Sequence, residues 1–391
     1  MNPAILHTDV QAYIRSNLHA DVHQIAMGKS PFPDVTAREL ATQISARKKS
    51  EKKLPTWFHQ VGIYFPEPLS IEQTSSEITA KHKATLVSRG RLIDLTGGFG
   101  VDSYYFAQQA TQVVHCELNE DLSRIAAHNA QILGVNNIRF TEGDGLAYLR
   151  SSGETFDTIY IDPARRSTAG KVFMLKDCLP NVVENAELLL AHSKRVIIKT
   201  SPLLDITAGL RELNHVAEVH IISTRNECKE LLFIIERDAA GPVKIVSTSL
   251  NEAVKEFSFY QDESATVNIA QTLGTYLYEP DVSLMKSGGF NLIGPRYGLE
   301  KLHDQTQLYT SNEFVEKFPG RIFRVDEIIN ASELKKRRNL EANVIVRNYP
   351  GTAEQLTKKY KIKPTQGQFL IFSSSHTMGL VVVLAHIEQY Y

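Results

Sequence analysis

The stretch Asp94-Leu-Thr-Gly-Gly-Phe-Gly100 directly overlaps the end of a short apolar run, Leu92 to Leu95, and leads into a helical segment. Its three glycines remove side chains where a backbone must bend and approach a ligand closely. A loop of this kind between a strand and a helix is typical of α/β proteins that bind nucleotide-like cofactors. The loop fails the dinucleotide pattern GxGxxG, because Ser103 stands where the third glycine is required.

Around this loop, short apolar runs alternate with helical segments, which predicts βαβ units on a parallel sheet. The predicted strands are Leu92 to Leu95, Val113 to Glu117, Ile138 to Phe140, Thr158 to Asp162, Val196 to Thr200, Ala217 to Ser223 and Leu231 to Glu236. The link between the last two, Thr224 to Glu230, is too short for a crossover helix, so these strands should form an antiparallel hairpin. We therefore expect a Rossmann-like α/β sheet of seven strands.

Ligands of open α/β sheets bind beyond the carboxyl ends of the strands, and three of these ends carry carboxylates. Glu117 ends the second strand, where it can accept hydrogen bonds from both ribose hydroxyls, although NAD sites share this spacing. Asp144 follows the third strand and can accept from an adenine amino group; a turn aspartate between glycines is an equally good reading. Asp162 ends the fourth strand, beside the expected reacting group.

Together these residues resemble the class I S-adenosylmethionine-dependent methyltransferases. The resemblance implies that S-adenosylmethionine is the cofactor, with Asp94 and the glycines along its methionyl part, Glu117 on the ribose, Asp144 beside the adenine and Asp162 at the acceptor site. The expected cofactor-binding residues are Asp94, Thr96, Gly97, Gly98, Phe99, Gly100, Glu117, Leu118, Asp144, Gly145 and Asp162. In this family the helix before the first strand often closes over the cofactor, which makes Thr79, Lys81 and His82 candidates as well, or ordinary helix-surface residues.

The sequence Asp162-Pro-Ala-Arg165 resembles the Asp/Asn-Pro-Pro-aromatic motif of enzymes that methylate planar amino groups in nucleic acids or glutamine side chains. An acid oxygen and a backbone carbonyl accept from the amino hydrogens there and aim the nitrogen lone pair at the methyl group. This chain departs from the motif at Ala164 and Arg165. We expect Asp162, Pro163 and Arg165 to be catalytic, and Arg165 and Arg166 to stack on a base or bind phosphate, unless they are solvent-facing loop residues.

Some C5 uridine methyltransferases carry Asp-Pro-Pro-Arg at this place, but they need a cysteine nucleophile after the fifth strand. Here that position reads Lys199-Thr-Ser-Pro202, so we exclude the C5 chemistry. Lys199 becomes a candidate contact to the acceptor, with a purely structural role at the strand end as the alternative.

The length of 391 residues predicts several folded units. We expect an N-terminal helical region (1–87), the methyltransferase domain (88–238), a β-rich connecting and ferredoxin-like segment (239–318) and a small α+β domain (319–391). Cys116, Cys178 and Cys228 stand singly, which predicts neither disulfides nor a metal site. Because no long apolar run or signal peptide is present, we expect a cytoplasmic protein without membrane contact.

The last domain is basic, with eleven Lys or Arg against six Asp or Glu from Pro319 onward. The whole-chain arrangement resembles bacterial methyltransferases with a THUMP-like C-terminal module, preceded by a ferredoxin-like segment near Tyr276 to Thr310. That resemblance favours RNA as the partner, contacted through Lys335, Lys336, Arg337 and Arg338, although such a charge run can also be a solvated helix face. The leading hypothesis is methylation of a base nitrogen in structured ribosomal or transfer RNA. Protein side-chain methylation and non-catalytic RNA binding with a retained cofactor pocket are the alternatives.

Overall fold

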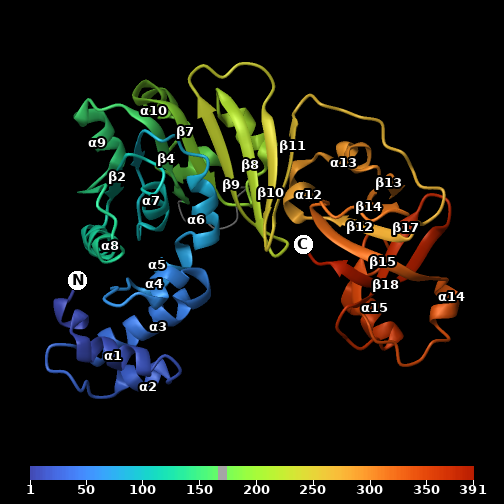
Figure 1. Cartoon of the computed structure of the whole chain (residues 1–391), viewed down its shortest axis with the longest axis horizontal. Helices are drawn as coiled ribbons and strands as arrows, with labels where there is room; N and C mark the ends of the chain where they lie inside the picture. The colour runs from blue at the N-terminus through green and yellow to red at the C-terminus, as the bar shows by residue number, and fades with distance from the viewer. Residues whose placement is uncertain (166–173) are drawn as a thin grey trace. The chain divides into compact units, whose positions relative to one another are not determined.

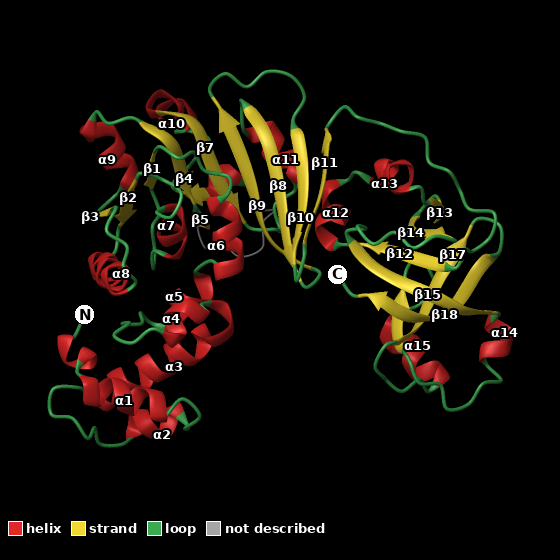
Figure 2. Ribbon diagram, viewed as in Figure 1, coloured by secondary structure: helices red, strands yellow, loops and turns green. Residues whose placement is uncertain are grey.

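The structure is a computed structural model that describes residues 1–165 and 174–391 (Figure 1). The chain divides into two compact units. The first unit comprises residues 1–217 and 232–240, and the second comprises residues 218–231 and 241–391. Figure 2 shows that helices dominate the N-terminal part of the first unit, whereas strands dominate the second.

The first unit contains a parallel sheet in the order β3-β2-β1-β4-β7, which confirms the expected α/β class. Its strands are β1 (Arg91–Asp94), β2 (Gln112–Glu117), β3 (Ile138–Glu142), β4 (Phe156–Ile161) and β7 (Ser193–Thr200). The helices that alternate with them are α7 (Val101–Phe106), α8 (Glu120–Ile132), α9 (Gly145–Ser152), α10 (Ala186–His192) and α11 (Ile206–Glu212). Buried apolar runs such as Leu92–Ile93 and Val113–Val114 fit strands covered on both faces.

The predicted hairpin is present as β8 (Val216–Thr224) and β9 (Glu227–Glu236), which are neighbours in their sheet. Only Arg225 and Asn226 separate them, with φ of 51° and 58°. Two consecutive residues at positive φ form the tight turn that joins antiparallel strands.

The expected total of seven strands is too low. In the second unit β10 (Lys244–Leu250) pairs in parallel with β8, and β11 (Val254–Tyr260) pairs antiparallel with β10. The chain turns back after β9 and adds these two strands beyond β8, because residues 243–249 supply the alternating β pattern that we expected in a connecting segment.

The N-terminal helices belong to the same unit as the parallel sheet. They are a 3₁₀ turn (Pro3–Leu6) and helices α1 (Thr8–Ser16), α2 (Val22–Met27), α3 (Ala37–Lys53), α4 (Pro55–His59), α5 (Pro68–Gln73) and α6 (Glu77–Ala84). Thr36 caps α3, because Thr36 and Glu39 form a reciprocal capping box. Asn129 of α8 accepts from the backbone N–H of Tyr64 at 3.0 Å and donates to its carbonyl at 2.9 Å, which fastens the loop before α5 to the sheet domain.

A second sheet, in the order β13-β14-β12-β15-β18-β17-β16, forms the rest of the second unit. Its elements are β12 (Tyr276–Pro280), α12 (Val282–Ser287), α13 (Phe290–Tyr297), β13 (Glu300–His303), β14 (Thr306–Ser311), β15 (Gly320–Ile329), α14 (Ala331–Leu334), β16 (Asn343–Val346), α15 (Ala353–Tyr360), β17 (Gln368–Ser375) and β18 (Gly379–Gln389). Because β12 pairs with β15, one sheet runs through both the ferredoxin-like segment and the α+β segment after it.

Candidate functional site

A cavity of about 480 Å³ lies at the carboxyl ends of β1, β2, β3 and β4 in the first unit. The predicted cofactor residues that line it are Asp94, Thr96, Gly97, Gly98, Phe99, Glu117, Leu118, Asp144, Gly145 and Asp162. Gly100 lies in the same loop but not in the lining; its φ of 83° shows that this position needs a glycine to turn into α7. The structure thus gathers residues from four strand ends into one site, as expected for a parallel sheet.

The loop after β1 is held by its own aspartate. Asp94 accepts from the backbone N–H of Thr96 at 3.0 Å and from the Ser103 hydroxyl at 2.7 Å. Gly97 must lack a side chain, because a Cβ there would lie 2.2 Å from Nε2 of the buried His115. Ser103 stands where the dinucleotide pattern requires a glycine, and its hydroxyl helps to hold the Asp94 carboxylate in place.

Burial raises the pKa of Asp94 to about 7, against the opposing effect of the hydrogen bonds from Ser103 and Thr96. The pKa of Asp94 in the folded protein lies above its ordinary value of 3.8, so protonated Asp94 contributes to the free energy of unfolding. This contribution is complete below pH about 4 and is lost as the pH rises through about 7. An ionised Asp94 is therefore costly for the fold but suited to a cationic ligand group.

Asp94→Asn should stabilise the ligand-free protein at pH 8 and weaken binding of the cationic cofactor. In the wild-type protein the affinity should rise between pH about 6 and 8 with release of a proton, since a bound cation favours the ionised carboxylate. Calorimetry in buffers of different ionisation enthalpy measures this release. A proton release that persists in Asp94→Asn would assign it to another group.

Glu117 and Asp144 face the same cavity from neighbouring strand ends. The two Glu117 oxygens accept from the backbone N–H groups of Gly98 at 2.8 Å and Asn119 at 2.9 Å. A carboxylate has about four acceptor positions, so both oxygens can also accept from ribose hydroxyls. Asp144 is exposed, and one of its oxygens caps α9 by accepting from the backbone N–H of Leu146 at 2.8 Å. Asp144 thus serves as the N-cap of α9, and its position in the cavity lining also permits the predicted contact to adenine.

The opposite end of the cavity is formed by the segment after β4. The Thr96 hydroxyl accepts from the backbone N–H of Asp162 at 2.7 Å, and the Lys199 ammonium donates to Oδ2 of Asp162. Pro163 is buried below the lining, whereas Ala164 belongs to it. The main chain of Arg165 pairs with Cys178 in a two-stranded ribbon of β5 (Ala164–Arg165) and β6 (Cys178–Leu179). Arg166 lies outside the described residues, as does the side chain of Arg165, so the expected contacts of these two side chains remain predictions.

The N-terminal part of the chain forms one wall of the cavity. The residues that line it precede α6, the helix from which the sequence analysis took its candidates. The lining includes Ser70, Gln73, Thr74 and Ser75, at the end of α5 and in the link to α6. The candidates Thr79, Lys81 and His82 lie on α6 and not in the lining, because α6 packs against α7 beside the cavity.

A buried polar network fixes this wall. The Lys83 ammonium has no exposed side-chain surface, donates to the Ser75 hydroxyl at 2.8 Å and lies 3.1 Å from Oδ1 of Asp102. Ser75 and Tyr160 donate to Oδ2 of Asp102 at 2.7 and 2.9 Å. Burial alone would raise the pKa of Asp102, but Lys83, Lys199 and these hydrogen bonds outweigh it, and the pKa is lowered.

The charged side chains in the described lining of the cavity are all acidic. Five carboxylates line the cavity, from Asp94, Asp102, Glu117, Asp144 and Asp162, and among the described residues no Lys, Arg or His does. Asp102 and Asp162 have lysine partners behind the surface, whereas Asp94 has none among its hydrogen bonds. Such a cavity favours a cationic ligand and opposes the diphosphate of a dinucleotide. The donor set therefore fits the sulfonium and ammonium of S-adenosylmethionine.

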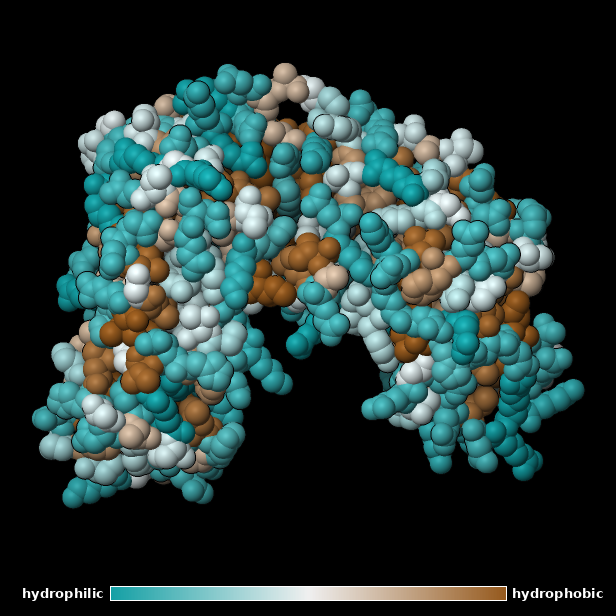
Figure 3. Space-filling view, in the orientation of Figure 1, coloured by the Kyte–Doolittle hydropathy of each residue, from teal (hydrophilic) through white to brown (hydrophobic). Residues whose placement is uncertain are grey.

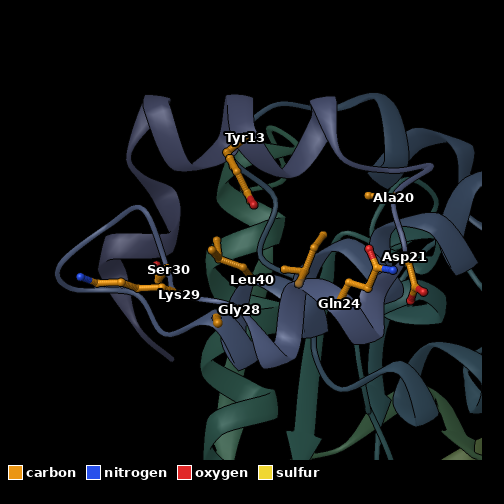
Figure 4. Close-up of a pocket in the computed structure, with 10 residues that line it drawn as sticks. Tyr13, Ala20, Asp21, Gln24, Gly28, Lys29, Ser30 and Leu40 are labelled. Atoms are coloured by element: carbon orange, nitrogen blue, oxygen red, sulfur yellow. The ribbon is translucent and has the colours of Figure 1, made fainter.

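Another cavity, of about 280 Å³, lies within the N-terminal helices between α1, α2 and α3 (Figure 4). Its polar side chains serve local turns: Asp21 caps α2, and Ser30 donates to the Phe32 carbonyl. No group of three or more His, Cys, Asp or Glu in residues 1–165 and 174–391 is arranged to hold a metal ion. Over the same residues, no helix has the length and apolar character needed to cross a membrane.

The predicted RNA-contacting residues Lys335, Lys336 and Arg338 lie in the second unit, where all three are exposed. Arg337 is different, because it is half-buried and forms an ion pair with Glu327. The structure therefore leaves three of the four cations of this run facing solvent.

Comparisons with known proteins extend this description. The crystal structure of a candidate methyltransferase from Porphyromonas gingivalis W83 matches with a TM-score of 0.88 and 29% identity, covering 99% of this chain and 98% of that one. The chain has a methyltransferase fold. Family models match a ferredoxin-like domain at residues 276–319 and a THUMP domain-like segment at residues 320–386.

Curated relatives match shorter stretches. An uncharacterized RNA methyltransferase of Mycoplasma mobile is 29% identical over 160 residues, which is 37% of this chain and 44% of the relative. A 23S rRNA (uracil(747)-C(5))-methyltransferase of Vibrio vulnificus is 31% identical over 105 residues, which is 25% of this chain and 28% of the relative. The chain thus spans less than half the length of these two relatives.

Proposed function

We propose that this protein is an S-adenosylmethionine-dependent methyltransferase that modifies a base nitrogen in structured RNA. The observation that carries the cofactor assignment is the acidic cavity at the strand ends, whose lining, as far as it is described, holds five carboxylates and no cation. When bound, S-adenosylmethionine supplies an electrophilic methyl group. Asp94 would hold its ammonium, Glu117 its ribose and Asp144 its adenine, while Asp162 faces the acceptor.

The proposal of RNA as the substrate rests on the second unit and on the names of the curated relatives. Six exposed cations, Lys335, Lys336, Arg338, Lys359, Lys361 and Lys363, form what we call the C-terminal basic surface. Residues 335–338 form one half of this surface and residues 359–363 the other. Backbone hydrogen bonds join the two segments, because the N–H of Lys363 donates to the Leu340 carbonyl and the N–H of Ala342 donates to the Lys363 carbonyl, both at 2.8 Å. Leu334 and Ile362, which flank the two halves, share one apolar cluster. Figure 3 shows hydrophilic side chains projecting where Figure 1 places α14 and α15.

The assay for this function uses purified protein and S-adenosylmethionine with a labelled methyl group. The acceptors are total RNA and total protein from the source organism after deletion of the gene. Label in RNA is the expected result. Label in protein alone would refute the RNA assignment and favour side-chain methylation. Binding of RNA and cofactor without any transfer, combined with an unchanged function of Asp162→Ala, would favour a non-catalytic role.

Neutralising Lys335, Lys336 and Arg338 together should weaken RNA binding and flatten its salt dependence. Each lost phosphate contact lowers the slope of log K against log salt by about 0.7–0.9, so the triple glutamine variant should lose roughly two in slope. Fluorescence anisotropy at several salt concentrations measures both quantities. The exposed lysines Lys48 and Lys52 of α3 provide the matched control. An equal loss in Lys48→Gln/Lys52→Gln would show that general charge, and not this surface, is responsible.

A further inference from the structure

The described lining of the cofactor cavity has accessible apolar side chains at two places. Leu118, which is 74% exposed, and Leu122 of α8 form one of them. Leu179, which is 52% exposed, and Pro180 form the other, which we call the Leu179–Pro180 surface. Apart from Ala164, the remaining apolar side chains of the described lining are buried: Leu95, Phe99 and Val101.

The two apolar surfaces lie on opposite sides of the loop after β1. In the sheet, β1 lies between β2 and β4. Leu118 directly follows β2, whereas Leu179 pairs with Ala164, two residues beyond Asp162 and the end of β4. Because paired residues of a ladder present their side chains on one face and Ala164 carries only a methyl group, Leu179 stays uncovered. The Leu179–Pro180 surface therefore lies at the acceptor end of the cavity.

The segment that carries Leu179 is anchored on both sides. Before it, the Glu212 carboxylate of α11 accepts from the backbone N–H of Leu175 at 2.8 Å. After it, the Asn181 side chain accepts from the backbone N–H of Val183 at 3.1 Å. These bonds hold the backbone on either side of Leu179, so its apolar side chain is fixed in the cavity lining.

The proposed cofactor can cover only one of the two apolar surfaces with a ring. S-adenosylmethionine contains one aromatic ring system, its adenine, which the proposed site places near Asp144 and Leu118. Its methionyl end carries an ammonium and a carboxylate and lies, in the same proposal, along the loop of Asp94. Covering an apolar side chain that faces water is favourable, so the Leu179–Pro180 surface fits a second flat ligand group.

We propose, on the basis of the RNA methyltransferase function proposed above, that the acceptor base rests with one face on Leu179 and Pro180. Enzymes that modify a base take it out of its stack, and leucine and proline are among the side chains that pack against unstacked bases. The surface replaces the aromatic residue of the amino-group motif, where this chain has Arg165. Apolar contact to a ring face reads no hydrogen-bonding edge. The Leu179–Pro180 surface thus selects a planar base over an aliphatic side chain, and does not choose among the four bases.

The experiment separates acceptor contacts from cofactor contacts. Initial rates of methyl transfer from labelled S-adenosylmethionine to total RNA of the deletion strain, at several RNA concentrations, give kcat/KM. Calorimetry with S-adenosylhomocysteine gives the cofactor affinity. Leu179→Ala should lower kcat/KM for RNA about tenfold, as for losing about half the burial of a leucine, and keep the cofactor affinity within about twofold. Leu118→Ala should instead weaken cofactor binding about tenfold.

Two further variants complete the test. Leu179→Phe should keep or raise kcat/KM, because an aromatic ring stacks on a base. Val61→Ala should behave as wild type in both measurements, since Val61 is 55% exposed but does not line this cavity.

The outcomes distinguish this proposal from the function on which it rests. A wild-type kcat/KM in Leu179→Ala, or an equal loss in Leu179→Phe, overturns the proposal while the RNA methyltransferase function stands. A loss of cofactor affinity in Leu179→Ala as large as its loss of rate also overturns it, because Leu179 would then contact the cofactor. Label in protein only, or no label at all with the wild-type protein, refutes both.

Discussion

Lys83→Met should lower the free energy of unfolding of the first unit by about 3–5 kcal/mol, the range for removing one partner of a buried ion pair. The lysine is completely buried, and its loss removes the nearest cation from the Asp102 carboxylate, which keeps the Ser75 and Tyr160 hydroxyls and the more distant charge of Lys199. The same change also removes the donor to Ser75, which lines the cavity. We therefore expect weaker cofactor binding together with the loss of stability.

Urea unfolding can be followed through Trp57, the single tryptophan of the chain. It is buried and contacts Phe99 of the cofactor loop and Tyr104 of α7, so its fluorescence reports on this part of the first unit. Lys81→Met is the matched control, because Lys81 is on the same helix with 59% of its side chain exposed, and its loss should cost less than about 1 kcal/mol. Adding Asp102→Asn to Lys83→Met should recover much of the loss, since no buried charge remains. Equal losses for Lys83→Met and Lys81→Met would show that the buried pair does not stabilise the fold.

Glu117→Ala should weaken cofactor binding by about ten- to a hundredfold, because charge-assisted hydrogen bonds contribute about 1.5–3 kcal/mol. The carboxylate also fixes the backbone N–H groups of Gly98 and Asn119, so its removal should loosen the loop that we propose for the methionyl part. Calorimetry with S-adenosylhomocysteine measures the affinity without turnover.

Glu120→Ala is the control for this experiment. Glu120 is exposed at the start of α8, three residues after Glu117, and pairs only weakly with Arg124 at 3.4 Å. Its removal should leave the affinity within about twofold, in keeping with the small energies of exposed ion pairs. An unchanged affinity in Glu117→Ala would place the cofactor elsewhere.

The fold class and the position of the candidate cofactor site could be predicted, because they depend on local patterns. Apolar runs that alternate with helices specify a parallel sheet, and the carboxyl ends of its strands necessarily meet at one edge. Asp94, Glu117 and Asp162 could therefore be placed together from the order of the strands alone. The addition of β10 and β11 to the sheet was missed, since the β pattern of residues 243–249 does not show with which strand it will pair.

The sequence by itself thus determined the sheet, its Gly-rich loop and the carboxylates at the strand ends. Only the tertiary structure decided that Ser75 closes the cavity through Lys83 and Asp102, that Lys199 pairs with Asp162, and that Lys363 lies beside the chain that follows Arg338. These contacts join residues far apart in the chain, and their energies come from burial and charge pairing in three dimensions, for which no periodic pattern exists in the sequence.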